Sequence, residues 1–134
     1  MDKNRILNYL KENGLSELEE LKYDDNNVIV LRFFYDFDDD EIEAARAYAN
    51  DESENEEDGE IWHEEFFIPY LNDLAIDNVG ECLEDLNDEL NIDSQYVSYD
   101  VDNEEFDYVE FIAIFFNKEN EIDIEKVLEV LEQA

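Results

Sequence analysis

Residues 108–116 have the sequence YVEFIAIFF, and residues 28–37 have the sequence VIVLRFFYDF. Both runs are almost continuously apolar and rich in β-branched and aromatic side chains, a composition that favours strands in the middle of a sheet. We therefore predict that residues 28–34 and 109–116 are neighbouring or near-neighbouring central strands of one sheet.

The segments around these strands predict helices that cover the sheet. Apolar residues recur every three or four positions in three segments, residues 2–13, 79–90 and 121–132. Asp2 can cap the first of these helices and Gly14 can end it. Acids at residues 38–40 can cap a further helix after the first central strand, because negative charge is favourable at a helix N-terminus.

Two segments fit more than one interpretation. Residues 15–23 fit a short second helix or an edge strand, and residues 61–68 fit a strand or an irregular apolar segment. Pro69 suits the first turn of a short helix over residues 70–76. Asp77 or Asn78 is then placed to cap the helix over residues 79–90.

These segments, with an alternating strand at residues 96–101, predict one α+β domain over residues 1–134. We expect a four- to five-stranded antiparallel, or mixed, sheet with helices packed on one face. Residues 1–50 and 77–134 both follow the order helix, strand, strand, helix, which indicates either a tandem repeat or chance matching among Phe- and Leu-rich segments. Between them, residues 50–60 (NDESENEEDGE) contain seven acids and no apolar residue, so we predict a mobile acidic loop.

Acidic side chains dominate the charge. The chain has 42 acids against eight Lys and Arg, a net charge of -34, and residues 47–117 contain 23 acids and no basic residue. Its apolar content of 44% is nevertheless too high for a disordered polyanion. Such a surface repels nucleic acid and anionic membranes, so its partner should be a basic protein surface. The lack of a long apolar run and the single cysteine, Cys82, predict a cytoplasmic protein.

The sequence offers little for catalysis or for a cofactor. It contains one histidine (His63), one cysteine, four serines and no threonine, and its three glycines form no phosphate-binding loop. Acids alternate at residues 36–40 and 100–104, but neither run has the glycine and glutamate that a calcium-binding EF-hand loop needs. We therefore expect no enzymatic activity, no cofactor and no dedicated metal site.

The candidate partner-binding residues are three groups of acids. They are the row Asp77, Glu81, Glu84, Asp85, Asp88 and Glu89 on the predicted helix, the cluster Asp36, Asp38, Asp39 and Asp40, and the loop acids Glu54, Glu56 and Glu57. Like charges three or four residues apart destabilise a helix, so an ordinary soluble helix would intersperse lysines. We favour the helix row as the partner-binding surface, because a rigid element holds charges at a spacing comparable to that of phosphates and loses little entropy on binding.

In charge, size and absence of catalytic groups, the whole chain resembles the DNA-mimic inhibitors, phage or mobile-element proteins that block restriction enzymes, CRISPR effectors or uracil-DNA glycosylase. The resemblance implies a non-enzymatic inhibitor of anti-CRISPR or anti-restriction type, which occupies the basic channel of a defence nuclease or a related DNA-acting protein. Three alternatives remain: an immunity protein that neutralises a toxin nuclease, an acidic chaperone or adaptor for basic proteins, and a merely solvated acidic surface.

Overall fold

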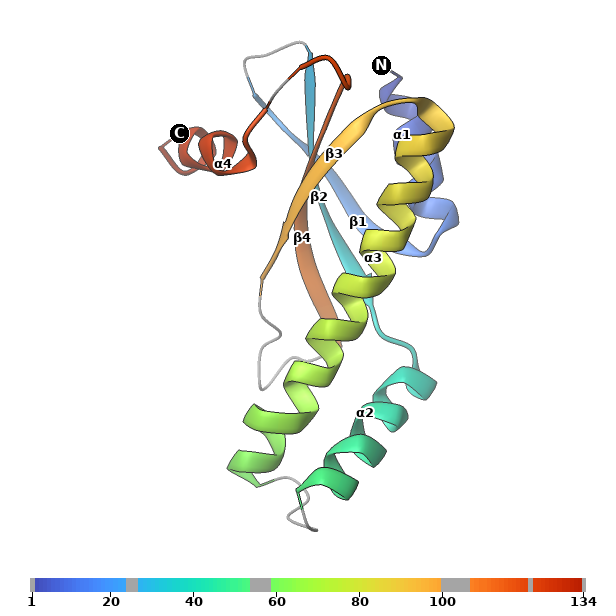
Figure 1. Ribbon diagram of the computed structural model, residues 1–134, viewed down its shortest axis with the longest axis vertical. Coiled ribbons are helices and arrows are strands. Elements are labelled where there is room, and N and C mark those ends of the chain that lie inside the picture. The colour runs from blue at the N-terminus through green and yellow to red at the C-terminus, as the bar shows by residue number, and fades with distance from the viewer. Residues whose placement is uncertain (1, 24–26, 54–58, 100–106, 121, 134) are drawn as a thin grey trace.

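The structure is a computed structural model that describes residues 2–23, 27–53, 59–99, 107–120 and 122–133. Its elements, in chain order, are α1 (Lys3–Glu12), β1 (Leu15–Leu21), β2 (Val28–Asp36), α2 (Asp39–Glu52), the π-helix η1 (Trp62–Phe67), α3 (Ile68–Leu90), β3 (Asp93–Ser98), β4 (Tyr108–Phe116) and α4 (Ile124–Gln133). Figure 1 shows that the strands form one sheet with helices around it, which confirms the predicted α+β class.

The sheet has four antiparallel strands in the order β1-β2-β4-β3. Strands β2 and β4 pair along their whole length, with Val28 opposite Phe116 and Asp36 opposite Tyr108. The two apolar runs are therefore the central neighbouring strands, as their composition predicts. β1 lies at one edge, so the strand interpretation of this segment is the one the structure supports.

Helices lie on both faces of the sheet, whereas the sequence predicted helices on one face. On the first face, α1 and α3 cover alternate residues of the central strands, where the rings of Phe33 and Phe111 stack with centroids 5.7 Å apart. On the second face, Val127 of α4 packs with Val30 and Ile114. The physical reason is the apolar run in β4, whose residues 111–116 are all buried and so need cover on both sides.

α3 is a single 23-residue helix, and two predictions for this region are wrong. Residues 61–68 are helical rather than a strand or an irregular segment, and residues 70–76 are not a separate helix from residues 79–90. Buried Leu71, Ala75 and Val79 continue the helical spacing straight through the acid and amide that were expected to cap a new helix.

The π-helix η1 leads into α3 and has a local cause. Pro69 lies in the first turn of α3, as predicted, but it has no amide hydrogen to donate to the turn before it. The chain widens there, and the amide of Ile68 donates to the carbonyl of His63, five residues back. A helical path thus continues across a proline that would interrupt a regular α-helix.

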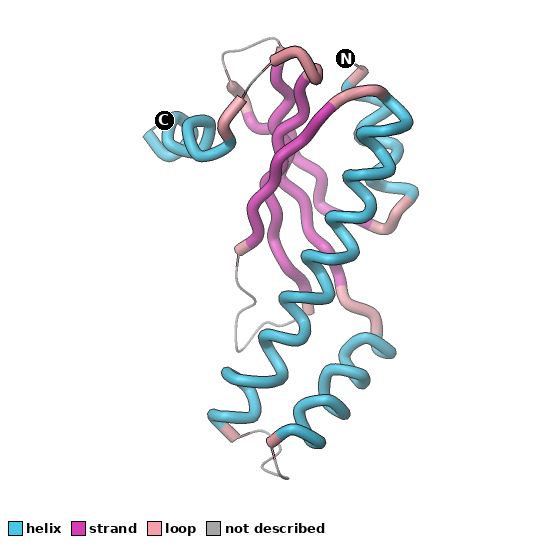
Figure 2. Tube along the Cα trace, viewed as in Figure 1, coloured by secondary structure: helices cyan, strands magenta, loops and turns pink. Residues whose placement is uncertain are grey.

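α2, η1 and residues 68–77 of α3 form a helical arm that extends past the end of the sheet, as Figure 2 shows. Its interior is aromatic: Trp62 stacks on Phe67 at 4.7 Å, and the Trp62 Nε1 donates to Asn50 Oδ1 at 2.9 Å. The guanidinium of Arg46 lies over both rings, at 5.7 and 5.4 Å. Residues 50–52, expected in the mobile loop, are the last turn of α2, while residues 54–58 lie outside the described residues.

Candidate functional site

The outward face of α3 carries the predicted row of acids as one continuous surface, which we call the α3 ridge. Its members are all exposed, while Val79, Leu83 and Leu86 on the opposite face are buried against the sheet. The ridge consists of Asp77, Glu81, Glu84, Asp85, Asp88 and Glu89. Because these residues share one helix, the structure brings the whole predicted row together.

The spacing of charge along the α3 ridge is close to that of a nucleic-acid strand. An α-helix rises about 1.5 Å per residue, so the six carboxylates from Asp77 to Glu89 are spread over roughly 18 Å. The mean interval between charges along the helix axis is therefore roughly 3.6 Å, compared with about 3.4 Å for the phosphates of one strand of duplex DNA.

The carboxylates of the α3 ridge have no cationic partner in the part of the chain that the structure describes. The salt bridges there join Lys3 to Glu20, and Arg32 to both Glu19 and Glu110. Arg5 and Lys118 border hollows beside the C-terminal end of the ridge, without forming a salt bridge to it. The ridge therefore presents its charge to solvent or to another molecule.

The α3 ridge opposes the stability of its own helix. Pairs such as Glu81 with Asp85, and Glu84 with Asp88, are four residues apart, where like charges cost a few tenths of a kcal/mol each. The last turn of α3 has no basic residue, so Asp88 and Glu89 meet the negative end of the helix dipole. Folding alone does not account for acids at these positions.

The second predicted cluster has a structural explanation. Asp38 is the N-cap of α2, as predicted: its Oδ1 accepts from the amide of Glu41 at 2.8 Å, and Glu41 Oε1 accepts from the amide of Asp38 at 3.0 Å. Asp39 and Asp40 are exposed in the first turn, where the dipole favours them. The Asp36 carboxylate accepts a hydrogen bond from the Ser16 hydroxyl. These acids are therefore weaker evidence for function than the α3 ridge.

A short chain of hydrogen bonds connects the start of α2 to the middle of α3. The hydroxyl of Tyr35 donates to Glu41 Oε2 at 2.5 Å and accepts from Asn78 Nδ2 at 2.7 Å. Burial, reinforced by the bond to Glu41, raises the pKa of Tyr35 to about 12, so the phenol stays neutral and remains a donor. These bonds hold the start of α2, with Asp38, Asp39 and Asp40, next to the Asp77 end of the α3 ridge. The loop acids Glu54, Glu56 and Glu57 lie outside the described residues.

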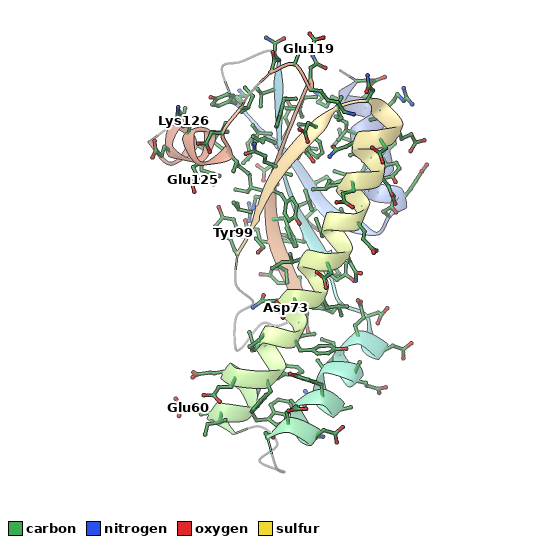
Figure 3. All side chains as sticks on the ribbon, viewed as in Figure 1. Glu60, Asp73, Tyr99, Glu119, Glu125 and Lys126 are labelled. Carbon is green, nitrogen blue, oxygen red and sulfur yellow. The ribbon has the colours of Figure 1, made fainter. Side chains whose placement is uncertain are left out.

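A feature that sequence reasoning missed is an aromatic groove on the arm. It has a volume of about 380 Å³ and is lined by Tyr48, Glu65, Phe66, Pro69, Tyr70, Asp73, Leu74 and Asp77. Figure 3 places Asp73 on the part of α3 that belongs to the arm. The signal was the spacing of residues 70, 73, 74 and 77, which share one side of a continuous helix. It was lost because residues 61–68 were interpreted as a strand or an irregular segment, which separates Phe66 from that helix.

The other candidate groups offer little reactivity. Burial, with a smaller contribution from Asp85, raises the pKa of the Cys82 thiol to about 11. The ring of His63 contacts those of Trp62 and Phe67, with centroids 4.9 and 5.5 Å away. Among the described residues, no group of three or more His, Cys, Asp or Glu is arranged to hold a metal ion, and residues 100–104 lie outside that set.

The described helices also include none with the length and apolar content needed to cross a membrane. Comparisons of the chain with protein-family models, with curated protein sequences and with solved structures gave no match. The α3 ridge and the aromatic groove are the two surface features from which we infer a function.

Proposed function

We propose that this protein is a non-enzymatic inhibitor that occupies the basic nucleic-acid channel of a DNA-acting protein, foremost a defence nuclease of the CRISPR or restriction type. The observation that carries this proposal is the α3 ridge: six exposed carboxylates at the linear charge density of one DNA strand, on a rigid helix. A channel lined with Lys and Arg to hold phosphates would bind such a row through the same charges.

The energetics of the α3 ridge favour binding over simple solvation. Acids kept only for solubility could stand anywhere on the surface, preferably near helix N-termini, and could alternate with lysines. The ridge instead carries like charges at four-residue spacing up to the C-terminus of α3. A basic partner would relieve both the repulsion between neighbours and the unfavourable dipole interaction, so part of the electrostatic free energy would be recovered on binding.

The net charge of -34 would act on the rate of encounter as well as on the complex. A strong field of one sign steers an oppositely charged partner and raises the association rate, an effect that salt weakens. We further propose a cytoplasmic location, where such targets work, and no catalytic activity.

Two other functions share part of this physics. An immunity protein for a toxin nuclease would use the same acids, and an acidic chaperone would bind many basic proteins loosely. The aromatic groove beside the Asp77 end of the α3 ridge favours a specific partner, because buried or half-buried aromatic anchors concentrate binding energy at a few positions. It therefore favours an inhibitor or an immunity protein over a general chaperone.

The test is a panel of purified enzymes, a Cas9-type nuclease, a restriction enzyme and uracil-DNA glycosylase, each assayed for DNA binding and activity with increasing inhibitor. The ridge variant replaces Glu84, Asp85 and Asp88 by Lys. Its matched control replaces Glu119, Glu125 and Glu129 by Lys, the same change of charge at exposed positions outside α3. We expect the parent to displace DNA from at least one enzyme, the ridge variant to be at least about tenfold weaker, and the control to stay close to the parent.

A kinetic comparison locates the surface more sharply. Reversal of the ridge charges should mainly raise the dissociation rate, because those carboxylates are held in place for contact. Reversal of Glu54, Glu56 and Glu57 should mainly lower the association rate, and more so at low salt. The proposal fails if the protein itself binds DNA in a gel shift at low salt. The ridge assignment fails if the ridge variant inhibits as well as the parent while the loop variant does not.

A further inference from the structure

We infer that the aromatic groove is a receptor for one arginine side chain of the partner protein. This inference rests on the proposed function, which supplies a partner surface rich in basic residues. Such an arginine would add one anchoring contact, located on the arm, to the electrostatic attraction between the partner and the carboxylates of the α3 ridge.

Three rings from three elements form the apolar part of the groove. Tyr48 of α2, Phe66 of η1 and Tyr70 of α3 meet with ring centroids 5.2 Å apart for Tyr48 and Tyr70, and 6.5 Å apart for Tyr48 and Phe66. Tyr48 nevertheless remains 42% exposed, so part of its ring is open to a ligand. A large aromatic side chain in this state is held in place by its neighbours before any partner arrives.

Carboxylates surround these rings. Asp73 and Asp77 lie one turn apart on α3, Glu65 lies on η1, and all three line the groove. Within the described ranges none of the three takes part in a salt bridge. The groove therefore combines two kinds of group that bind a positive charge. Aromatic ring faces attract cations, and carboxylates pair with them.

Arginine fits this combination better than lysine. Its guanidinium is flat, stacks on aromatic rings, is weakly hydrated and offers several donors to carboxylates in one plane, whereas the lysine ammonium is a strongly hydrated point charge. The methylene stem of the arginine can pack on the apolar surface of Pro69 and Leu74, which also line the groove.

The arm already contains one arginine that lies over aromatic rings. Arg46 of α2 lies over the rings of Trp62 and Phe67, at 5.7 and 5.4 Å from their centroids. Asp77 lines the groove and also begins the α3 ridge, so the two surfaces are continuous. A partner that follows the ridge toward its Asp77 end would bring a basic side chain to the groove.

The inference can be tested before any partner is known, by NMR titration of the protein with N-acetyl-arginine amide at physiological salt. The ring signals of Tyr48, Phe66 and Tyr70 should shift and saturate. N-acetyl-citrulline amide, which has nearly the same shape without the charge, should not shift them. N-acetyl-lysine amide should bind about two- to fivefold more weakly than the arginine probe.

Variants at exposed positions make the test specific. Tyr48→Ala should abolish the saturable shifts, Tyr48→Phe should preserve them, and Asp73→Asn should weaken binding about two- to fivefold. Tyr99→Ala is the matched control, because Tyr99 is also 42% exposed and lies beyond β3, away from the groove. We expect it to bind like the parent.

Other outcomes overturn the inference. Equal binding of lysine and arginine would show a general cation site, and shifts spread over the amides of the α3 ridge without ring shifts would show only diffuse attraction. Either result leaves the proposed function standing, since that is judged by DNA displacement and the ridge variant. Conversely, saturable ring shifts in a protein that displaces no DNA would support arginine binding in the groove and contradict the proposed inhibitor function.

Discussion

Cys82 shows at the scale of one residue how burial decides chemistry. Burial and the nearby Asp85 raise the pKa of its thiol from 9.0 to about 11, and the thiolate is the reactive form. At pH 8 we therefore expect Cys82 in the folded protein to react with a thiol reagent about a hundredfold more slowly than in the unfolded chain. Reaction rates measured with and without denaturant test this, and equal rates would contradict it.

The same shift has a consequence for stability. A pKa raised on folding means that the neutral thiol is favoured in the folded state, so its contribution is complete below pH 9.0. That contribution is lost as the pH rises through about 11. The reactivity of the folded protein should climb over the same range.

The backbone conformation of Glu17 leads to a prediction about stability. It has a φ of 53° at the register shift between Ser16 and Glu19 in β1, a left-handed conformation that costs a residue with a Cβ about 1 kcal/mol. We expect Glu17→Gly to raise the free energy of unfolding by up to about 1 kcal/mol. Glu17→Ala removes the same charge and keeps the Cβ, so it should give no such gain in urea unfolding.

Single-residue roles could be predicted from the sequence only where both partners are local. Asp38 was predicted to cap α2, and its partner Glu41 is three residues away. Asn78 was expected to cap a helix, but its amide donates to Tyr35, 43 residues earlier in the chain. No local pattern contains that contact, because it depends on how α3 crosses the end of β2.

Among the elements, α3 depends on a glycine in its middle to approach the sheet. A Cβ added at Gly80 would lie 2.8 Å from the hydroxyl oxygen of Tyr96 in β3, but 3.9 Å from the ring carbon that carries it. Gly80→Ala alone should destabilise the protein, because this clash outweighs the better helix propensity. With Tyr96→Phe the clash is removed, so the same change should stabilise by up to about 1 kcal/mol.

A double-mutant cycle of thermal or urea unfolding measures this reversal of sign. Tyr48→Phe, which removes a hydroxyl elsewhere on the surface, serves as the control background. If Gly80→Ala has the same effect in all three backgrounds, Tyr96 and Gly80 are not in close contact.

Elements with a continuous or periodic apolar pattern were predictable, whereas η1 and the continuity of α3 through residues 76–79 were not. β2 and β4 follow from their sequence because burial on both faces leaves a continuous apolar run. The helical nature of η1 was missed because Trp62, Phe66 and Phe67 resemble strand residues, while their partners Tyr48, Arg46 and Asn50 lie on α2. The arm is thus built by contacts between helices, which local propensity does not record.

For the whole molecule, charge is unevenly distributed along the chain. Residues 36–79 contain 17 acids and Arg46 as their one Lys or Arg, and the guanidinium of Arg46 lies over two rings of the arm. The α3 ridge could be predicted because all its members share one helix. The aromatic groove could not, because its rings come from α2, η1 and α3, and only the packing of the arm brings them together.

The acids of the α3 ridge serve either folding or binding, and the stability of a charge-reversed variant distinguishes the two. Replacing Glu84, Asp85 and Asp88 by Lys makes the four-residue pairs 81–85 and 85–89 attractive, leaves the pair 84–88 like-charged, and places a cation in the last turn of α3. At low salt these changes should raise the free energy of unfolding by about 1–2 kcal/mol. The parent should gain more stability than this variant between low salt and about 0.5 M salt, because the parent helix carries more net repulsion for salt to screen.

Urea unfolding and DNA displacement, measured on the same preparations, then separate the explanations. A variant that is more stable and a weaker inhibitor would show that the acids are kept for a partner at the expense of the fold. One that is more stable and inhibits equally well would place the binding surface elsewhere. A less stable variant would contradict the electrostatic description of α3, because it would mean that the ridge carboxylates stabilise the native helix.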